Sequence, residues 1–416
     1  MTTYKTRILT AIATGSVLLQ AVAGSAFAAT TITINGNGDS SNNTANVTRD
    51  SDTTVVQNND ANITNNVDVN SSTGYNDANR NTGGDVTIDT GNATANVTVS
   101  NQANANQADV QGCGACAGGN TTVNITNNGV NSDNDVDVDQ YNDTSVYQDN
   151  HAHIDNDVDV DAKTGNNDAN RNTGGNVEIT TGDADTTVNL STAANVNHAV
   201  VGGGSGNGGG ISALIKGNGD SSDNDIDLNF DNDVTVSQDN HAHVDNDVDV
   251  NGSTGDNDAN RNTGGDVTID TGDATADITV DNMVNFNSAD VEDCCVDDVE
   301  ASIEKNGVDS DNSIDVDLDI NDDEESGTFQ NNHAHVDNDL RYVDLKTGGN
   351  DADRNTGSGD SDPSVTTGDA DATVDVSNQV NANSYGPDAG FELPDMNLHF
   401  SFDLGDLLNW LSGQVN

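Results

Sequence analysis

The sequence has few basic residues, few aromatic residues and no long apolar run after its first 28 residues. Twelve Lys and Arg stand against 71 Asp and Glu, which gives a net charge of −59. Nucleic acids are bound by basic side chains that neutralise phosphates, so this balance argues strongly against nucleic acids as partners. No later stretch approaches the roughly 18 apolar residues of a membrane-spanning helix. Aromatic residues are 3% of the chain, which leaves almost none of the aromatic platforms that carbohydrate-acting solenoids usually present.

High net charge with few aromatic residues is typical of disordered chains. The order of the residues argues against disorder here, because Val and Ile alternate with Asp over long stretches and Gly returns at fixed offsets. No pairing of a nucleophile with a base, no phosphate-binding loop and no paired Glu recurs in a setting that resembles a pocket. We therefore expect a folded protein that is not an enzyme.

The first 28 residues have the pattern of a secretory signal peptide. Lys5 and Arg7 form a positive start, an apolar stretch runs from Ile8 to Gly24, and a small-residue cleavage site ends at Ala28. A membrane anchor is the alternative, but the stretch is short and interrupted by Thr and Ser, which favours export. Cleavage would remove two basic residues and no acidic one, so the mature chain carries 10 − 71 = −61. The sequence predicts a secreted protein, free or attached non-covalently to the cell surface.

An octapeptide divides the rest of the chain into repeats. Asp77-Ala-Asn-Arg-Asn-Thr-Gly-Gly84 returns as Asp168–Gly175, as Asp258–Gly265 and, degraded, as Asp351–Gly357. Its arginines lie 91, 90 and 93 residues apart, and spacing this regular indicates an internal repeat. The predicted division is a signal peptide at 1–28, solenoid repeats at 29–122, 123–212, 213–300 and 301–385, and a C-terminal segment at 386–416.

A shorter period lies within each repeat. Ala45, Ala61, Ala78 and Ala95 are separated by 16, 17 and 17 residues, and the next two repeats give the same series. Between these positions β-branched residues alternate with polar ones, as in half-buried strands, and Thr-Gly, Gly-Gly and Asn-Gly pairs supply the positive φ that corners need. Such a unit cannot bury its apolar row unless it is stacked on copies of itself. The sequence therefore predicts an all-β fold, a β-solenoid of about 20 two-strand coils of ~17 residues, forming a rod roughly 100 Å long.

Stacking has opposite consequences for Asn and Asp. In-register coils place identical side chains roughly 4.8 Å apart, where Asn amides form hydrogen-bonded ladders. Asp carboxylates stacked in the same way repel one another. Carboxylates and backbone carbonyls are the hard oxygen ligands that Ca²⁺ prefers. We therefore expect Ca²⁺ or other divalent cations, or high salt, to stabilise the folded protein.

The composition becomes apolar from Gly386 onward, with Phe391, Leu393 and Trp410 among the apolar residues. The favoured interpretation is a cap over the open end of the solenoid, whose edge would otherwise recruit other chains. The alternative is a docking patch for a cell-surface component or another copy of the protein.

Three repeats carry a His-x-His-x-Asp sequence. With Ala152 and Ile154 inward, two imidazoles and a carboxylate share the outer face of one strand, a set that can hold zinc or copper. Surface histidines copied with the repeat need no metal, and this interpretation is favoured. Successive pairs should lie about five coils apart, roughly 24 Å, so no site should combine two repeats. The candidate metal ligands are His151, His153, Asp155, His241, His243, Asp245, His333, His335 and Asp337.

The arginines and cysteines are given structural roles. Each octapeptide arginine is expected to form an ion pair with Asp, turned outward or buried, and isolated cations in so acidic a field are not expected to bind anions. Cys113 and Cys116 form a CxxC and Cys294 and Cys295 are adjacent, without the context of a redox motif or zinc ribbon. The two pairs should lie about 50 Å apart, and export favours local disulfides or links between molecules.

Runs such as Val146–Ile154 and Ser100–Asn106, with their Asn- and Gln-punctuated coils, carry a resemblance. In the style of its coils, over about 31–385, the chain resembles curlin-like and other secreted β-solenoid surface proteins of bacteria. The resemblance implies a role in a matrix, filament or surface layer, with other copies or cell-surface components as partners. The first hypothesis is an extracellular structural or adhesive protein that forms a rigid, acidic rod. The alternatives are a calcium- or transition-metal-binding surface module and an ice-binding solenoid with a flat Thr face.

Overall fold

The computed structural model describes residues 5–14, 17–23, 29–111, 120–202, 210–291, 299–320, 326–357 and 363–386. All regular elements in these residues are strands, and they form four parallel sheets. The expected all-β class and parallel stacking are therefore confirmed. The segment predicted to be a cap lies beyond the described residues, so the cap stays a prediction. In the described part of the chain, no helix is long and apolar enough to cross a membrane.

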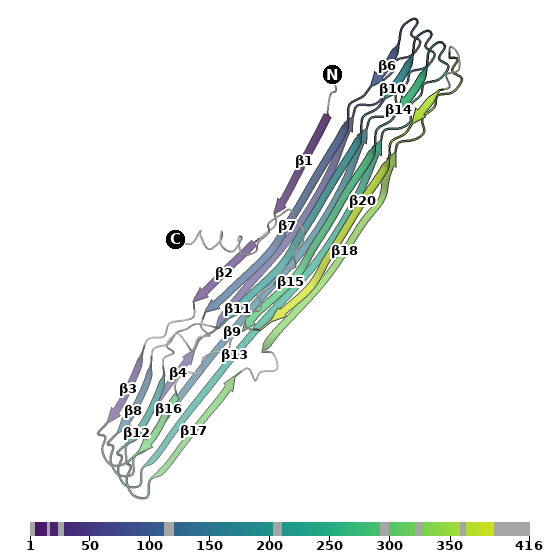
Figure 1. The fold of residues 1–416 in the computed structure, drawn as a ribbon. Helices are drawn as coiled ribbons and strands as arrows, with labels where there is room; N and C mark the ends of the chain where they lie inside the picture. Colours follow the sequence, from purple (N-terminus) through teal and green to yellow (C-terminus); the bar gives the residue numbers. More distant parts are fainter. Residues whose placement is uncertain are drawn as a thin grey trace.

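Two long sheets and two short sheets contain all the described strands (Figure 1). One long sheet holds β1 (Lys5–Thr14), β2 (Val17–Ala23), β7 (Ala93–Gln111), β11 (Ala184–Val201), β15 (Ala274–Val291) and β20 (Ala370–Tyr385). The other holds β4 (Asn42–Asp50), β5 (Thr53–Ser72), β9 (Asp133–Lys163), β13 (Asp223–Ser253), β17 (Asp311–Ile320) and β18 (Gly327–Lys346). The short sheets hold β3 (Thr30–Asn35), β8 (Thr121–Thr126), β12 (Ile211–Lys216) and β16 (Val299–Glu304), and β6 (Val86–Asp89), β10 (Val177–Thr180), β14 (Val267–Asp270) and β19 (Ser364–Thr366).

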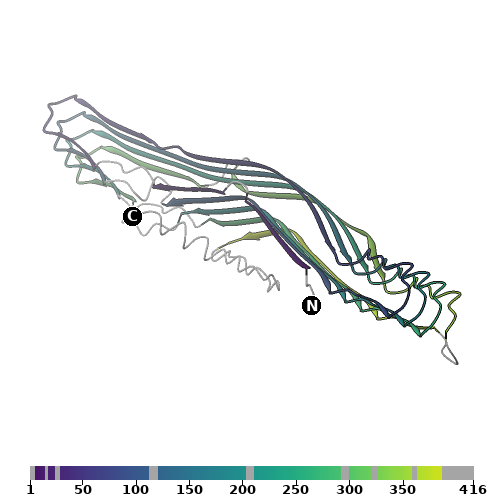
Figure 2. The ribbon, with the colours of Figure 1, turned by 90° about the horizontal axis from the view of Figure 1, so that it is seen from above.

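Each large repeat forms one coil of a flattened solenoid, and the coils are numbered 1 to 4 in chain order. In coil 2 the chain leaves β8, runs outward along β9, turns through the octapeptide at one tip, and returns through β10 and β11. Strands of neighbouring coils pair in parallel, so that Ala61 lies beside Ala152 and Ala152 beside Ala242. Figure 2 shows the coils side by side along the whole length of the molecule.

The predicted coil of ~17 residues is wrong, and so is the predicted number of about 20 coils. Ala45, Ala61 and Ala95 are core positions within one coil, and each pairs with a residue 91 positions later. The chain has no corner inside β9, which continues without a break for 31 residues. That strand alone spans about 100 Å at 3.3 Å per residue. The long axis therefore follows the strands, whereas the sequence placed it along the stacking direction.

The alternation of Val or Ile with Asp gives each long strand one buried face and one outer face. Val158 and Val160 of β9 are fully buried and pack in one cluster with Val188 and Leu190 of β11. The Asp residues between the valines lie on the outer face, half-buried or exposed. Burial of these paired rows, at about 25 cal/mol per Å² of apolar surface, holds the two long sheets together.

Amide columns cross the interior between the apolar clusters. The Nδ2 atom of Asn150 donates to the Oδ1 atom of Asn240 in coil 3 at 3.0 Å and to that of Asn197 in the facing sheet at 2.7 Å. A glutamine column runs beside it, in which Gln148 Nε2 donates to Gln57 Oε1 at 2.7 Å and Gln238 Nε2 to Gln148 Oε1 at 2.8 Å. The predicted amide ladders are present, with a step of one large repeat.

The N-terminal strands lie on the solenoid. Residues 1–28 were expected to stand outside the fold, but β1 and β2 pair in parallel with β7, from Lys5 beside Ala93 to Ala23 beside Gln111. An open parallel edge accepts any extended segment, because its backbone groups need partners. The predicted cleavage after Ala28 stays a prediction.

A row of glycines at the tip tests the observed coil length. A Cβ atom at Gly165 would overlap the carbonyl oxygen of Gly255 in the next coil, whereas a Cβ at the equivalent Gly348 in coil 4 meets nothing within 4 Å. We expect Gly165→Ala to lower the free energy of unfolding by about 1–3 kcal/mol because the backbone must shift. Gly348→Ala should change it by less than about 0.5 kcal/mol. Urea unfolding of both variants measures this, and equal effects would contradict the observed stacking.

Candidate functional site

The four octapeptides stack at one tip and line a groove of about 450 Å³. Asp77 pairs with Asp168, Asp168 with Asp258, and Asp258 with Asp351, as isolated parallel bridges. Asp and Arg residues of all four coils, and Asn residues of coils 1 to 3, form the walls. Burial, followed by the charges of Asp168 and Asp351, raises the pKa of Asp258. The groove therefore carries a carboxylate row and a guanidinium row side by side.

The octapeptide arginines form a row and are not isolated cations. Arg80, Arg171, Arg261 and Arg354 have φ between 56° and 60° and are exposed. The predicted ion pair is present at Arg354, whose Nε lies 3.4 Å from Asp353. Positive φ is uncommon for residues other than glycine. In coils 1 to 3 it is held because the arginine backbone N–H donates to a carbonyl of the next coil, as from Arg80 to Asn170 at 2.9 Å.

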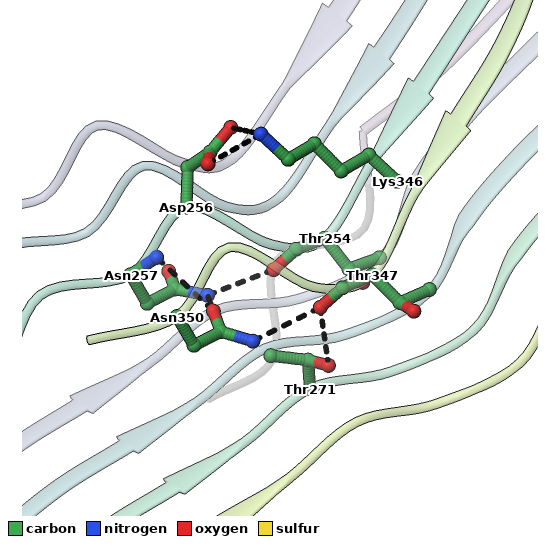
Figure 3. Close-up of polar contacts among 7 residues, drawn as sticks. All are labelled: Thr254, Asp256, Asn257, Thr271, Lys346, Thr347 and Asn350. Carbon is green, nitrogen blue, oxygen red and sulfur yellow. Dashed lines mark hydrogen bonds and ion pairs between the residues drawn. The ribbon is translucent and has the colours of Figure 1, made fainter. Parts of the chain in front are cut away.

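The corner before the octapeptide is fixed by side-chain amides (Figure 3). Asn257 Nδ2 donates to the carbonyl of Thr254 at 2.9 Å and to Asn350 Oδ1 at 2.8 Å, and Asn350 repeats the first bond with Thr347. On the outer side, Lys346 Nζ pairs with both carboxylate oxygens of Asp256, at 2.6 and 2.8 Å. These contacts hold the octapeptides of successive coils in register.

Rows of carboxylates follow the outer face of β9, β13 and β18. Asp155, Asp245 and Asp337 form one row, and Asp157, Asp247 and Asp339 form the next. The two rows border a groove of about 320 Å³. Its coil 4 end contains the guanidinium of Arg341, which pairs with Asp339. The chain thus places one of its few cations between the carboxylate rows.

The three His pairs form two columns beside these rows. The rings of His151 and His241 stack with centroids 4.9 Å apart and planes 4° apart, and His241 stacks on His333 at 4.8 Å. His153, His243 and His335 form a second column with 4.9 Å steps. The expectation of roughly 24 Å between pairs is wrong, because equivalent residues of successive repeats are direct neighbours. Asp60 and Asn62 occupy the same positions in coil 1.

The stacked imidazole rings, as they lie in this structure, are not arranged to share a metal ion. Equivalent nitrogens of parallel rings 4.9 Å apart are farther from each other than the ~4.2 Å that two Zn–N bonds can span. A shared ion would require rotation of the imidazoles. Among the described residues, the acidic side chains of Asp143, Asp231 and Asp233 do lie within 4.8 Å of one another. The His-x-His-x-Asp metal set stays a prediction.

Other predicted features fall outside the described residues or are dispersed. Cys113, Cys116, Cys294 and Cys295 lie in segments that the structure does not describe, so their disulfides stay predictions. The Thr94 position, part of the Thr face that ice binding would need, is Asp in coils 2 and 4 and Thr in coil 3.

Sequence reasoning missed the rows themselves. The Asp rows, the His columns and the octapeptide groove each combine equivalent residues of several repeats, and the assumed ~17-residue coil kept those residues apart. A signal was present, since His-Ala-His recurs at steps of 90 and 92 residues with nearly identical flanking residues. Identical side chains are what in-register stacking brings together.

A scan against protein-family models, a search of curated proteins and a search of solved structures each found no match to this chain.

The carboxylate rows predict an unusual pH dependence. Burial, followed by neighbouring Asp charges, raises the pKa of Asp137, Asp227 and Asp247 above 3.8. The folded state therefore binds protons more readily than the unfolded chain just above that pH, and stability should rise as the pH falls through this range. Burial and the stacked histidines lower the pKa of His241, so stability should first decrease as the pH falls below 6.5.

Thermal unfolding between pH 7 and pH 4, at constant ionic strength, measures this profile. Asp227→Asn should reduce the gain at low pH and leave the initial decrease unchanged, whereas His241→Asn should reduce the initial decrease. A melting temperature that falls steadily toward pH 4 would contradict the assigned direction.

Proposed function

We propose that this protein is an exported, non-catalytic structural element, a rigid acidic scaffold of a cell surface or extracellular matrix, whose outer carboxylate rows bind divalent cations. The single observation that carries the proposal is the in-register stacking of Asp on Asp along β9, β13 and β18. Like charges directly opposite each other destabilise a sheet. A fold that repeats this arrangement along its length needs counter-ions.

The choice of cation follows from ligand chemistry. Carboxylate oxygens suit Ca²⁺, which accepts six to eight oxygen ligands in flexible geometry. The groove between the Asp245 and Asp247 rows already contains the guanidinium of Arg341 at one end. In coils 2 and 3 the groove is lined by carboxylates without a cationic side chain, and metal ions would take the place of the guanidinium there.

The rigid scaffold is supported by the interior. Buried amide columns connect successive coils in both long sheets, and each such hydrogen bond contributes about 1 kcal/mol. Strands of up to 31 residues without a break leave few hinge positions along the molecule. These properties suit a load-bearing or spacing role better than the binding of a small molecule.

Calcium should stabilise the full-length protein more than ionic strength alone does. Millimolar Ca²⁺ should raise the melting temperature by about 5 °C over excess chelator, with sodium chloride at matched ionic strength as the reference. Asp245→Asn removes a central carboxylate and should raise the melting temperature in chelator and reduce the Ca²⁺ increment. Asp309→Asn, with the same charge change in a turn, should preserve the increment. Equal melting temperatures in calcium and chelator would reject specific cation binding.

A second candidate function is transition-metal binding by the His columns. It draws on the proximity of the imidazoles of coils 2, 3 and 4, whose ring centroids lie 4.8–4.9 Å apart and whose rings would rotate to share an ion. Zn²⁺ titration followed by calorimetry should give stoichiometric binding. His243→Asn places in coil 3 the amide that coil 1 has at Asn62, and it should weaken binding at least about tenfold. Unchanged affinity in this variant would reject the site.

A further inference from the structure

The last coil leaves its core-facing row open. Ile314 and Val376 in coil 4 are 46% and 44% exposed, whereas their register partners Ile226 and Val280 in coil 3 are both 0% exposed. The same contrast holds between Val374 and its buried partner in coil 3. An aliphatic row of this kind is covered wherever a further coil follows it.

In the first coil, buried amide oxygens lack hydrogen-bond donors that a further coil would supply. In one buried column the amide nitrogen of each Asn donates to the Oδ1 of the Asn in the next coil. The donor–acceptor distance is 3.0 Å from Asn104 to Asn195, 3.0 Å from Asn195 to Asn285 and 3.1 Å from Asn285 to Asn381. At the coil 1 end, the buried Oδ1 atoms of Asn104 and Asn59 have no donor. At the coil 4 end, Asn381 is exposed and has no acceptor for its Nδ2 among the described residues. A coil placed before coil 1 would supply the missing donor.

The outer charges of the two ends are also complementary. At several outer positions where coils 2 and 4 have Asp, coil 1 has Asn or Thr. Asn66 Nδ2 and Asn70 Nδ2 already donate to Asp157 and Asp161 of coil 2 at 3.3 Å. If coil 4 of one copy lay on coil 1 of another in the same register, its carboxylates would meet amides or hydroxyls. The pairs would be Asp315 with Asn46, Asp317 with Thr48, Asp337 with Thr64, Asp339 with Asn66 and Asp344 with Asn70.

In this structure the N-terminal strands occupy part of that surface. β1 and β2 pair with the free edge of β7, and Asn104 lies opposite the break between them. Residues 5–23 contain one amide side chain, Gln20, whose register partner is Ala108. The two strands therefore pair with the backbone of β7 on either side of Asn104.

We propose that coil 4 of one copy stacks in register on coil 1 of a second copy, so that copies join head to tail in a continuous parallel ladder, and that residues 5–23 block this surface until they are removed. The proposal goes beyond the scaffold function and depends on it only for the removal of residues 1–28 during export. Each added copy contributes four coils, and therefore lengthens the assembly by about 19 Å.

The test uses the full-length chain with a specific protease site inserted after Ala28, purified folded and then cleaved. Before cleavage we expect single copies by analytical ultracentrifugation. After cleavage we expect chains of copies, visible by electron microscopy, with an axial repeat of about 19 Å. Single copies after cleavage at every concentration would overturn the proposal. So would assembly that requires removal of residues 387–416, because that segment would then be the occupant of coil 4.

Matched variants locate the junction. Asn66→Asp with Asn70→Asp restores carboxylates on coil 1 and should raise the concentration needed for assembly by about tenfold at low salt. Asn229→Asp with Asn251→Asp adds the same charge inside coil 3 and should leave that concentration unchanged. Equal effects of the two pairs would overturn the assigned surface.

Asn381→Asp, an exposed change in coil 4, provides a second junction variant, and circular dichroism before cleavage checks folding. The calcium-dependent melting of the uncleaved chain is a separate measurement, so a failure of stacking does not touch the scaffold proposal.

Discussion

The structure depends on one constraint, the parallel pairing of each residue with its equivalent in the next coil. This pairing repeats every side chain at the strand spacing, about 4.8 Å. For Asn the repetition is favourable, since each amide is both donor and acceptor, and the column from Asn104 to Asn381 results. For Asp it is unfavourable, because like charges are brought together. The same rule therefore produces a cohesive interior and an outer face on which like charges repel one another.

Much of the fold could be predicted from the alternation and the repeats. Val136 and Val138 separated by Asp indicate a strand with one buried face, and the structure buries both valines completely. The coil length could not be read from this alternation, since a period of two residues fits a short coil and a long one equally well. The positions of the glycines indicate the coil length better. β9 contains no glycine, whereas Gly165, Gly174, Gly175 and Gly182 all lie between β9 and β11, so corners are expected only where the long strands end.

Because the predicted coil was too short, the sequence predicted which residues lie on the outer face but not which residues are their neighbours. The types of residue were recognised correctly, as His151 and His153 do share the outer face with Asp155. Their neighbours were not recognised, because the stacking partner of a residue depends on the coil length. His241 was expected to be remote from His151 and its ring lies 4.9 Å away. In the same way Arg171 was treated as an isolated cation, although Arg80 and Arg261 line the same groove.

The buried amides have a role that apolar packing cannot perform. A strand such as β9, with Val at alternate positions, could slip by two residues against its neighbour and still bury every valine. The columns at Gln148, Asn150 and Asn156, all buried, remove this ambiguity. A two-residue slip would place Asn150 beside Ala242 or Gln238 in coil 3, and each amide left unsatisfied would cost about 1–3 kcal/mol. The polar columns thus fix the register, and the register in turn creates the His columns, the Asp rows and the octapeptide groove.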